Sequence, residues 1–453
     1  MSFREEKDTM GTVRVPEDAY FGPQTQRAVE NFPISGLTLP AAFMHALALI
    51  KQCAARVNSE LGLLDADTSK AISQAAQEVM DGKFDNQFVV DVFQTGSGTS
   101  TNMNMNEVIA SRANEIITGK KGGQKPVHPH DHVNLGQSSN DVMPSAIHIA
   151  ALISIKKDLM PSLDLLHKAI ANKAVEFDQI KKIGRTHLQD AVPMTLGDEF
   201  SGYARQIELG IERVKTVEER LAELALGGTA VGTGLNTHPE FSAKAVALIS
   251  NYSDLTFKPA KNRFEAQAAR DAAVETSGAL KTIAVSLVKI ANDVRWLASG
   301  PHCGLGEINI PALQPGSSIM PGKVNPVIPE AVIQAAAQVA GNDTTIMLGG
   351  QGGNFELNAM LPVIAYNLLQ SISLLATTSK VFAEKCIRGT TANREVCEAY
   401  IAKSLALATG LVPHIGYDRA AAIAKKAHET GKTIREIASQ EGILSEEALN
   451  KLL

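Results

Sequence analysis

Apolar side chains recur along most of this 453-residue chain at the spacing of helix faces. The pattern predicts helices over residues 40–62 and 64–81, the second opening with Asp65 or Asp67 as its cap. Longer helices are predicted over residues 140–177 (interrupted by Pro144 and Pro161), 193–226, 262–299, 327–348 and 357–385. From residue 393 onward the periodic segments are short and separated by glycines. The fold class is therefore predicted to be mainly α.

The long helices also predict domains and an oligomer. A helix over residues 262–299 would be about 57 Å long at about 1.5 Å per residue. Apolar residues on more than one of its faces would stay exposed in a monomer, which predicts association through a helical bundle. The change in the length of the predicted helices divides the chain into an N-terminal domain (residues 1–138), a central long-helix bundle (139–392) and a small C-terminal helical domain (393–453).

Composition narrows the class of protein further. Only 5% of residues are aromatic and 20% are charged, with a net charge of -5, so no basic field indicates nucleic acid or an acidic membrane as partner. The chain starts with charged residues and contains no apolar run of membrane-spanning length, which predicts a cytoplasmic protein. Four cysteines lie far apart, so we expect reduced, mostly buried thiols rather than a disulfide framework or a zinc site.

One polar loop, Gly316-Ser-Ser-Ile-Met-Pro-Gly-Lys-Val-Asn-Pro326, first suggests a phosphate site because a glycine precedes a lysine. The spacing does not fit, since five residues separate Gly316 from Gly322 and Val324 stands where a magnesium-binding hydroxyl is required. The loop therefore indicates an anion other than a nucleotide phosphate.

Residues 96–106 form a second polar stretch, in which Ser97 and Thr99 are followed by Asn102, Asn104 and Asn106. A helix cap is the alternative interpretation of each hydroxyl, but a cap needs only one.

A third stretch, residues 126–140, carries alternating histidines, His128, His130 and His132. In an extended chain they would share one face, which leaves a metal site open. Asp131 is the only carboxylate nearby, so surface histidines or an anion-binding turn are favoured.

In the fourth stretch, residues 184–193, Thr186 and His187 precede a helix that Pro193 is expected to begin. A single loop histidine is often structural. Taken together, however, the four stretches supply hydroxyls, amides, a lysine and a histidine without a nucleotide fingerprint. Such groups suit addition to, or elimination from, a small dicarboxylate without a cofactor.

At these residues the sequence closely resembles the fumarase/aspartase superfamily, whose signature is the loop over residues 316–326. The match runs from Arg14-Val-Pro-Glu-Asp-Ala-Tyr-Phe-Gly22 to the C-terminal short helices, and the class II, metal-independent fumarases are the nearest members. The resemblance implies a central bundle of long helices and a homotetramer whose active sites each draw loops from three subunits. It also implies a tricarboxylic acid cycle lyase that adds water to fumarate and needs no metal or organic cofactor.

The same resemblance implies roles for individual residues. His187 paired with Glu330 would handle the water, Ser317 would take the C3 proton of L-malate, and Lys323 would help stabilise the serine alkoxide. The residues implied to bind substrate are Ser97, Gly98, Thr99, Ser138, Ser139, Asn140, Thr186, Ser318, Lys323, Val324 and Asn325. A second dicarboxylate site is implied at Lys125, His128, Pro129, His130 and Asp131, where His130 replaces the asparagine usual in the family.

Two other functions stay open at this point. An aspartate ammonia-lyase is favoured by Val327-Ile-Pro-Glu330 and Gly341-Asn-Asp-Thr-Thr345, but His187 stands where aspartases usually have glutamine. A non-catalytic structural relative would have lost part of the polar set, which is complete here.

Overall fold

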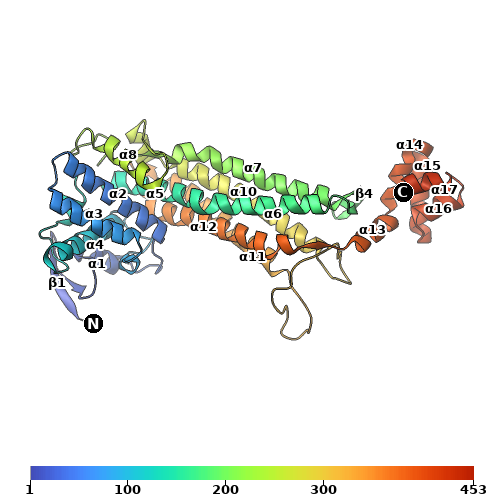
Figure 1. Ribbon diagram of the computed structural model, residues 1–453, viewed down its shortest axis with the longest axis horizontal. Coiled ribbons are helices and arrows are strands. Elements are labelled where there is room, and N and C mark those ends of the chain that lie inside the picture. Colours follow the sequence, from blue (N-terminus) through green and yellow to red (C-terminus); the bar gives the residue numbers. More distant parts are fainter. Residues whose placement is uncertain (1, 453) are drawn as a thin grey trace. The chain divides into compact units, whose positions relative to one another are not determined.

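The structure is a computed structural model that describes residues 2–452, with side chains described as far as Leu449. It is mainly helical, which confirms the predicted fold class, and short paired strands lie in the connections (Figure 1). Its residues cluster into two compact units. One contains Met1–Pro161, Gly210–Ala284 and Ala336–Thr377, and the other contains Ser162–Leu209, Val285–Ala335 and Thr378–Leu453. The division into three domains stays a prediction.

The first unit begins with an antiparallel hairpin that the sequence reading did not predict. Its elements are β1 (Phe3–Asp8), β2 (Gly11–Pro16), α1 (Pro23–Asn31), α2 (Ala41–Glu60), α3 (Ala66–Met80), a 3-10 turn (Asp85–Gln87), α4 (Thr99–Thr118), the π-helical turn η2 (Pro129–Val133), α5 (Ser139–Ser154), η3 (Ile155–Leu159), β5 (Glu223–Leu224), α8 (Phe241–Ser253), β6 (Lys258–Pro259), α9 (Arg263–Ala268), β8 (Gly353–Asn354) and β9 (Leu357–Asn358).

Side-chain caps fix where two of these helices begin. Asp65 accepts a hydrogen bond from the Thr68 amide and so caps α3, as predicted. Ser138 caps α5 in a capping box, in which the Asp141 carboxylate accepts from the Ser138 amide at 2.9 Å.

Five long helices contribute residues to both units: α6 (Met160–Glu176), α7 (Leu196–Leu221), α10 (Asp271–Leu297), α11 (Val327–Gly350) and α12 (Leu361–Lys385). Within the first unit, Ser277 of α10 donates to Asp343 of α11, and Asn342 of α11 donates to Ser371 of α12. The helices lie side by side there as a bundle (Figure 1).

The second unit holds the β3–β4 hairpin and the C-terminal helices. Its remaining elements are β3 (Lys181–Thr186), β4 (Gln189–Thr195), β7 (Ile308–Asn309), a 3-10 turn (Ile387–Gly389), β10 (Thr391–Ala392), α13 (Arg394–Lys403), a 3-10 turn (Leu405–Leu407), α14 (Ala408–Ile415), α15 (Tyr417–Thr430), α16 (Ile434–Gln440) and α17 (Glu446–Leu452). The last four helices pack together near the C-terminus (Figure 1). Their buried side chains form an apolar cluster that includes Leu411, Ile423 and Ile437.

Several predicted boundaries are wrong. Pro193 does not begin a helix but pairs with Ile183 in the hairpin, and α7 starts at Leu196. The segment 262–299 is two helices, because the chain is extended at Ala269. Pro144 lies inside α5 without ending it. Residues 353–358 form a hairpin, so the helix expected from residue 357 starts at Leu361.

One apolar helix of the bundle, α12, has the length and composition of a membrane span. Residues 361–389 are long and apolar enough to cross a membrane by length and composition, and 56% of the most apolar window is buried within the protein. A core helix has the same composition. Three cysteines are buried as expected, whereas Cys303 is exposed.

Candidate active site

Three hydroxyls from the predicted set meet where α4 and α5 begin. The Thr99 hydroxyl lies 2.7 Å from the Ser139 hydroxyl and 2.8 Å from that of Ser97. Free backbone N–H groups and the helix dipole favour an anion at a helix N-terminus, and here two such ends meet. The arrangement suits a carboxylate that accepts from several donors.

The backbone around these hydroxyls depends on glycine. Gly98 has φ 74°, and a Cβ at this position would lie 2.3 Å from the Met143 Cε atom. Gly98 is the N-cap of α4, and the side-chain oxygen that accepts from the first turn of the helix, at the Thr101 amide, is that of Gln94. The cap interpretation of Ser97 and Thr99 is therefore wrong, and their hydroxyls contact each other and Ser139 instead. Asn102, Asn104 and Asn106 are buried within α4 and do not line a loop.

Asn140 and Asp141 tie the start of α5 to the glycine-rich connection before α8. The Asn140 side-chain amide donates to the Ala230 carbonyl at 2.8 Å. The Asp141 carboxylate is fully buried and accepts from the amides of Gly227 and Thr229, each at 2.9 Å. Burial raises the pKa of Asp141 to about 6, although these N–H groups act in the opposite direction.

The signature loop closes on itself. The Gly316 amide donates to the Lys323 carbonyl at 2.7 Å, and the Asn325 side-chain amide donates to the Gly316 carbonyl at 2.7 Å. A Cβ on Gly316 would lie 2.5 Å from that Lys323 carbonyl oxygen, so this close approach requires glycine. Ser317 is half-buried, and Ser318, Lys323 and Val324 are exposed.

Inside this loop, Ser317 is surrounded by backbone donors. Its hydroxyl oxygen accepts from the amides of Ile319 at 3.2 Å and Met320 at 3.0 Å. Two N–H groups directed at one oxygen would stabilise negative charge on it.

Thr186 and His187 lie at the tip of the β3–β4 hairpin and are exposed. His187 has φ 57° and Leu188 has φ 60°, in the left-handed region that non-glycine residues rarely occupy. Below the tip, Arg185 donates two hydrogen bonds of 2.9 Å to the buried carboxylate of Glu307. This pair anchors the strand that leads to His187.

Glu330 lies in the first turn of α11 and is half-buried. Within residues 2–452, no hydrogen bond or ion pair joins Glu330 to His187. The predicted set also divides between the units, since Ser97, Thr99 and Ser138–Asn140 belong to the first and the predicted residues from Thr186 onward to the second.

The histidines of the predicted second site form a π-helical turn, so the expectation that they share a face of an extended chain is wrong. The His128 Nδ1 atom accepts from the amides of His130 and Asp131 at 3.3 and 3.2 Å. His130 Nε2 lies 2.6 Å from the Gln24 side-chain nitrogen. Partial burial and the neighbouring His128 lower the pKa of His130, which favours the neutral ring. Across the described residues, no group of three or more metal-ligating side chains could hold a metal ion.

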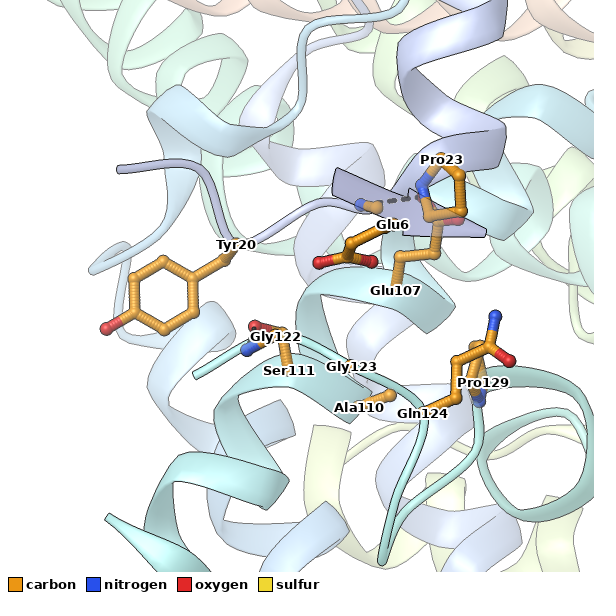
Figure 2. A pocket seen from close by; sticks show the side chains of 11 residues that line it. Glu6, Tyr20, Pro23, Glu107, Ala110, Ser111, Gly122, Gly123, Gln124 and Pro129 are labelled. Atoms are coloured by element: carbon orange, nitrogen blue, oxygen red, sulfur yellow. Dashed lines mark hydrogen bonds between the residues drawn. The ribbon is translucent and has the colours of Figure 1, made fainter. Parts of the chain in front are cut away.

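Beside this turn lies the small cavity shown in Figure 2, lined among others by Glu6, Glu107, Ser111, Gln124 and Pro129. Its space of about 10 Å³ is enough for about one water molecule and too small for a dicarboxylate. The second dicarboxylate site therefore stays a prediction, on the exposed face that Lys125, His130 and Asp131 present.

Sequence reasoning missed the buried charges that support these loops: Lys51, Asp141, Lys182 and Glu307. Two of them had a signal. Asp141 stands three residues after Ser138, which is capping-box spacing, and Lys51 interrupts the apolar run of residues 46–50. Lys182 and Glu307 are 125 residues apart in sequence and had none.

Known proteins resemble this chain over its whole length. Residues 11–341 match a family described as lyase, and residues 407–453 match one described as fumarase C C-terminus. A class II fumarate hydratase of Nitrosomonas europaea is 56% identical, covering 98% of this chain and 96% of its own. The mitochondrial fumarate hydratase 1 of Arabidopsis thaliana is 54% identical, and the match covers 100% of this chain and 92% of the Arabidopsis protein. A crystal structure of class II fumarase from Schistosoma mansoni superposes with a TM-score of 0.96 at 41% identity. The superposition covers 100% of this chain and 98% of the Schistosoma chain.

Proposed function

The chain belongs to the class II fumarate hydratases of the fumarase/aspartase superfamily, and we propose that the residues predicted from its sequence carry out the hydration. It is a lyase that interconverts fumarate and L-malate, and its substrate is a dicarboxylate. The observation that carries the residue assignment is the cluster of Ser97, Thr99 and Ser139 hydroxyls at two helix N-termini. This is a site for one substrate carboxylate, with Asn140 as a further donor.

In the dehydration direction, Ser317 takes the C3 proton of L-malate. The electron pair of the C–H bond moves into the adjacent carboxylate and gives an aci-carboxylate. The Ile319 and Met320 amides that donate to the Ser317 oxygen support this role, because they stabilise an alkoxide. Lys323 and Asn325 of the same loop hold the carboxylate on which the charge accumulates.

His187, paired with Glu330, then protonates the C2 hydroxyl as the C–O bond breaks, and water leaves on the opposite face. In the hydration direction the same imidazole accepts a proton from water. A carboxylate partner keeps an imidazole basic enough for this step. Thr186 lies beside it in the hairpin and binds a substrate oxygen.

The active enzyme is a homotetramer in which three subunits contribute to each site. Large apolar side chains exposed on the long helices support this assembly: Val285 of α10 at 63%, Leu348 of α11 at 55% and Val381 of α12 at 40% exposure. We place the enzyme in the cytoplasm. No metal or organic cofactor takes part in the proposed steps.

The test follows fumarate absorbance in purified protein given L-malate or L-aspartate, with and without a chelator. We expect fumarate from L-malate alone, unaffected by the chelator. His187→Gln should lower kcat by about 10² to 10⁴. His414→Gln, on the exposed surface of α14, serves as the matched control and should leave kcat unchanged. Fumarate from L-aspartate alone, or full activity in His187→Gln, would overturn the assignment.

A further inference from the structure

A lysine is buried against the turn that precedes α5. Lys51 of α2 has no exposed surface, and its ammonium donates to the side-chain oxygens of Asn134 and Gln137, both at 3.0 Å. Burial lowers the pKa of Lys51 to about 7, and the opposite charge of Asp141 works against that change. The positive charge of Lys51 also contributes to the lowered pKa of His130. Burying an ammonium whose direct partners are two amides costs free energy, which indicates that Lys51 has a role other than stabilising the fold.

The amide partners of Lys51 lead to the helix that carries Thr99. The Asn134 side-chain oxygen accepts from Lys51 and also from the Asn102 and Asn106 amides of α4, at 3.1 and 3.2 Å. Asn102 follows Thr99 by three residues, about one helical turn. One oxygen therefore joins α2 to the first turns of α4.

The same partners lead to the segment that carries Ser139 and Asn140. The Asn134 side chain donates to the Gln137 carbonyl at 3.1 Å, and Gln137 directly precedes Ser138. The Gln137 side-chain amide donates to the carbonyls of Val133 and Leu135, so the turn over residues 133–137 closes around Lys51. The ammonium is thus bonded to both side chains that shape this turn.

We propose that Lys51 is a positioning residue, whose ammonium holds the turn 134–137 against α4 so that Ser139 and Asn140 bind a substrate carboxylate together with Thr99. The inference rests on the proposed function, since it gives Lys51 a role in binding the dicarboxylate that the enzyme hydrates. Without the ammonium, Gln137 loses a donor at its oxygen while Asn134 keeps two. The Gln137 end of the turn, next to Ser138, is therefore the part that moves.

The experiment replaces Lys51 by methionine in the full-length protein, which removes the charge at similar volume. Lys173→Met is the matched control, because Lys173 is 7% exposed on α6 and pairs with Glu176, outside the proposed site. Binding of succinate, a dicarboxylate that cannot be hydrated, is measured by calorimetry beside kcat and KM for fumarate. We expect the succinate Kd and the fumarate KM to rise about tenfold in Lys51→Met with a smaller change in kcat, the pattern of lost ground-state binding.

Several outcomes separate this inference from the proposed function. A Lys51→Met protein that melts earlier but binds succinate like the wild type would overturn the positioning role. If Lys51→Met does not fold, Gln137→Met decides, since it removes the acceptor of one Lys51 hydrogen bond together with the two bonds that the Gln137 amide donates within the turn. A raised Kd supports the role of the turn that Lys51 holds, and an unchanged one overturns it. A wild-type protein that does not hydrate fumarate would overturn the proposed function, whatever Lys51 does to succinate binding.

Discussion

Replacing Glu307 by glutamine removes the charge that anchors the hairpin carrying His187. The Glu307 carboxylate has no exposed surface, accepts two hydrogen bonds of 2.9 Å from Arg185 and lies 3.4 Å from the Lys182 ammonium. Removing one partner of a buried ion pair costs about 3–5 kcal/mol. The lower end, about 3 kcal/mol, applies here because glutamine keeps one acceptor and Lys182 keeps Glu199 at 3.1 Å.

The loss should appear in two measurements. The melting temperature should fall by several degrees, since each kcal/mol corresponds to about 2–4 °C for a compact unit of 150–250 residues. The kcat for fumarate should fall about ten- to hundredfold, because a histidine displaced by about 1 Å loses its alignment with the water.

Glu208→Gln provides the control for this prediction. It makes the same chemical change at an exposed pair on α7, where Arg205 lies 2.7 Å away. Exposed pairs contribute little to stability, so this variant should behave like the wild type. If Glu307→Gln matched Glu208→Gln in both melting temperature and kcat, the backbone pairing of β3 with β4 would suffice to hold His187, and the reasoning would be wrong.

Two further predictions concern the first unit. Gly98→Ala places a methyl group against Met143 in a left-handed backbone, so urea denaturation should show a loss of about 1–3 kcal/mol and the fumarate KM should rise; unchanged values would contradict the need for glycine. For Lys51, the folded pKa of about 7 lies below the unfolded 10.5, so above pH 7 the unfolded chain binds more protons. The unfolding free energy of the wild type should therefore rise relative to Lys51→Met by up to about 1.4 kcal/mol per pH unit between pH 7 and 9, and parallel curves would contradict the lowered pKa of the buried lysine.

The helices were predictable from sequence because burial of one face imposes a period on the residues. That period placed α2, α3 and α11 within a few residues of their observed bounds. It failed at Pro193, where a proline after a loop resembles a helix start but lies in a strand. It also failed at His128, His130 and His132, because alternation predicts a shared face only in an extended chain. Local patterns do not show which backbone state tertiary contacts select.

The candidate residues were found because hydroxyls, amides, His187 and Lys323 concentrate in four short stretches. The sequence does not show how far apart these side chains lie or which of them are in contact. The Thr99–Ser139 contact joins residues 40 positions apart, and Glu307 meets Arg185 across 122. Lys182 follows another lysine, Lys181, and Glu307 stands between Gly306 and Ile308, so nothing local pairs the two charges. The set also divides between two units, so no single stretch of chain contains a complete site.

The hairpin tip shows which local backbone preference His187 goes against. A two-residue turn with positive φ at both central positions favours asparagine and glycine, yet this one holds histidine at 57° and leucine at 60°. Strain of this kind costs about 1–3 kcal/mol per residue and persists only where the surroundings enforce it. Here the β3–β4 register and the Arg185–Glu307 pair enforce it. A sequence optimised for the turn alone would have placed asparagine and glycine there. A histidine at this position goes against that preference, which supports the proton-transfer role proposed for its imidazole.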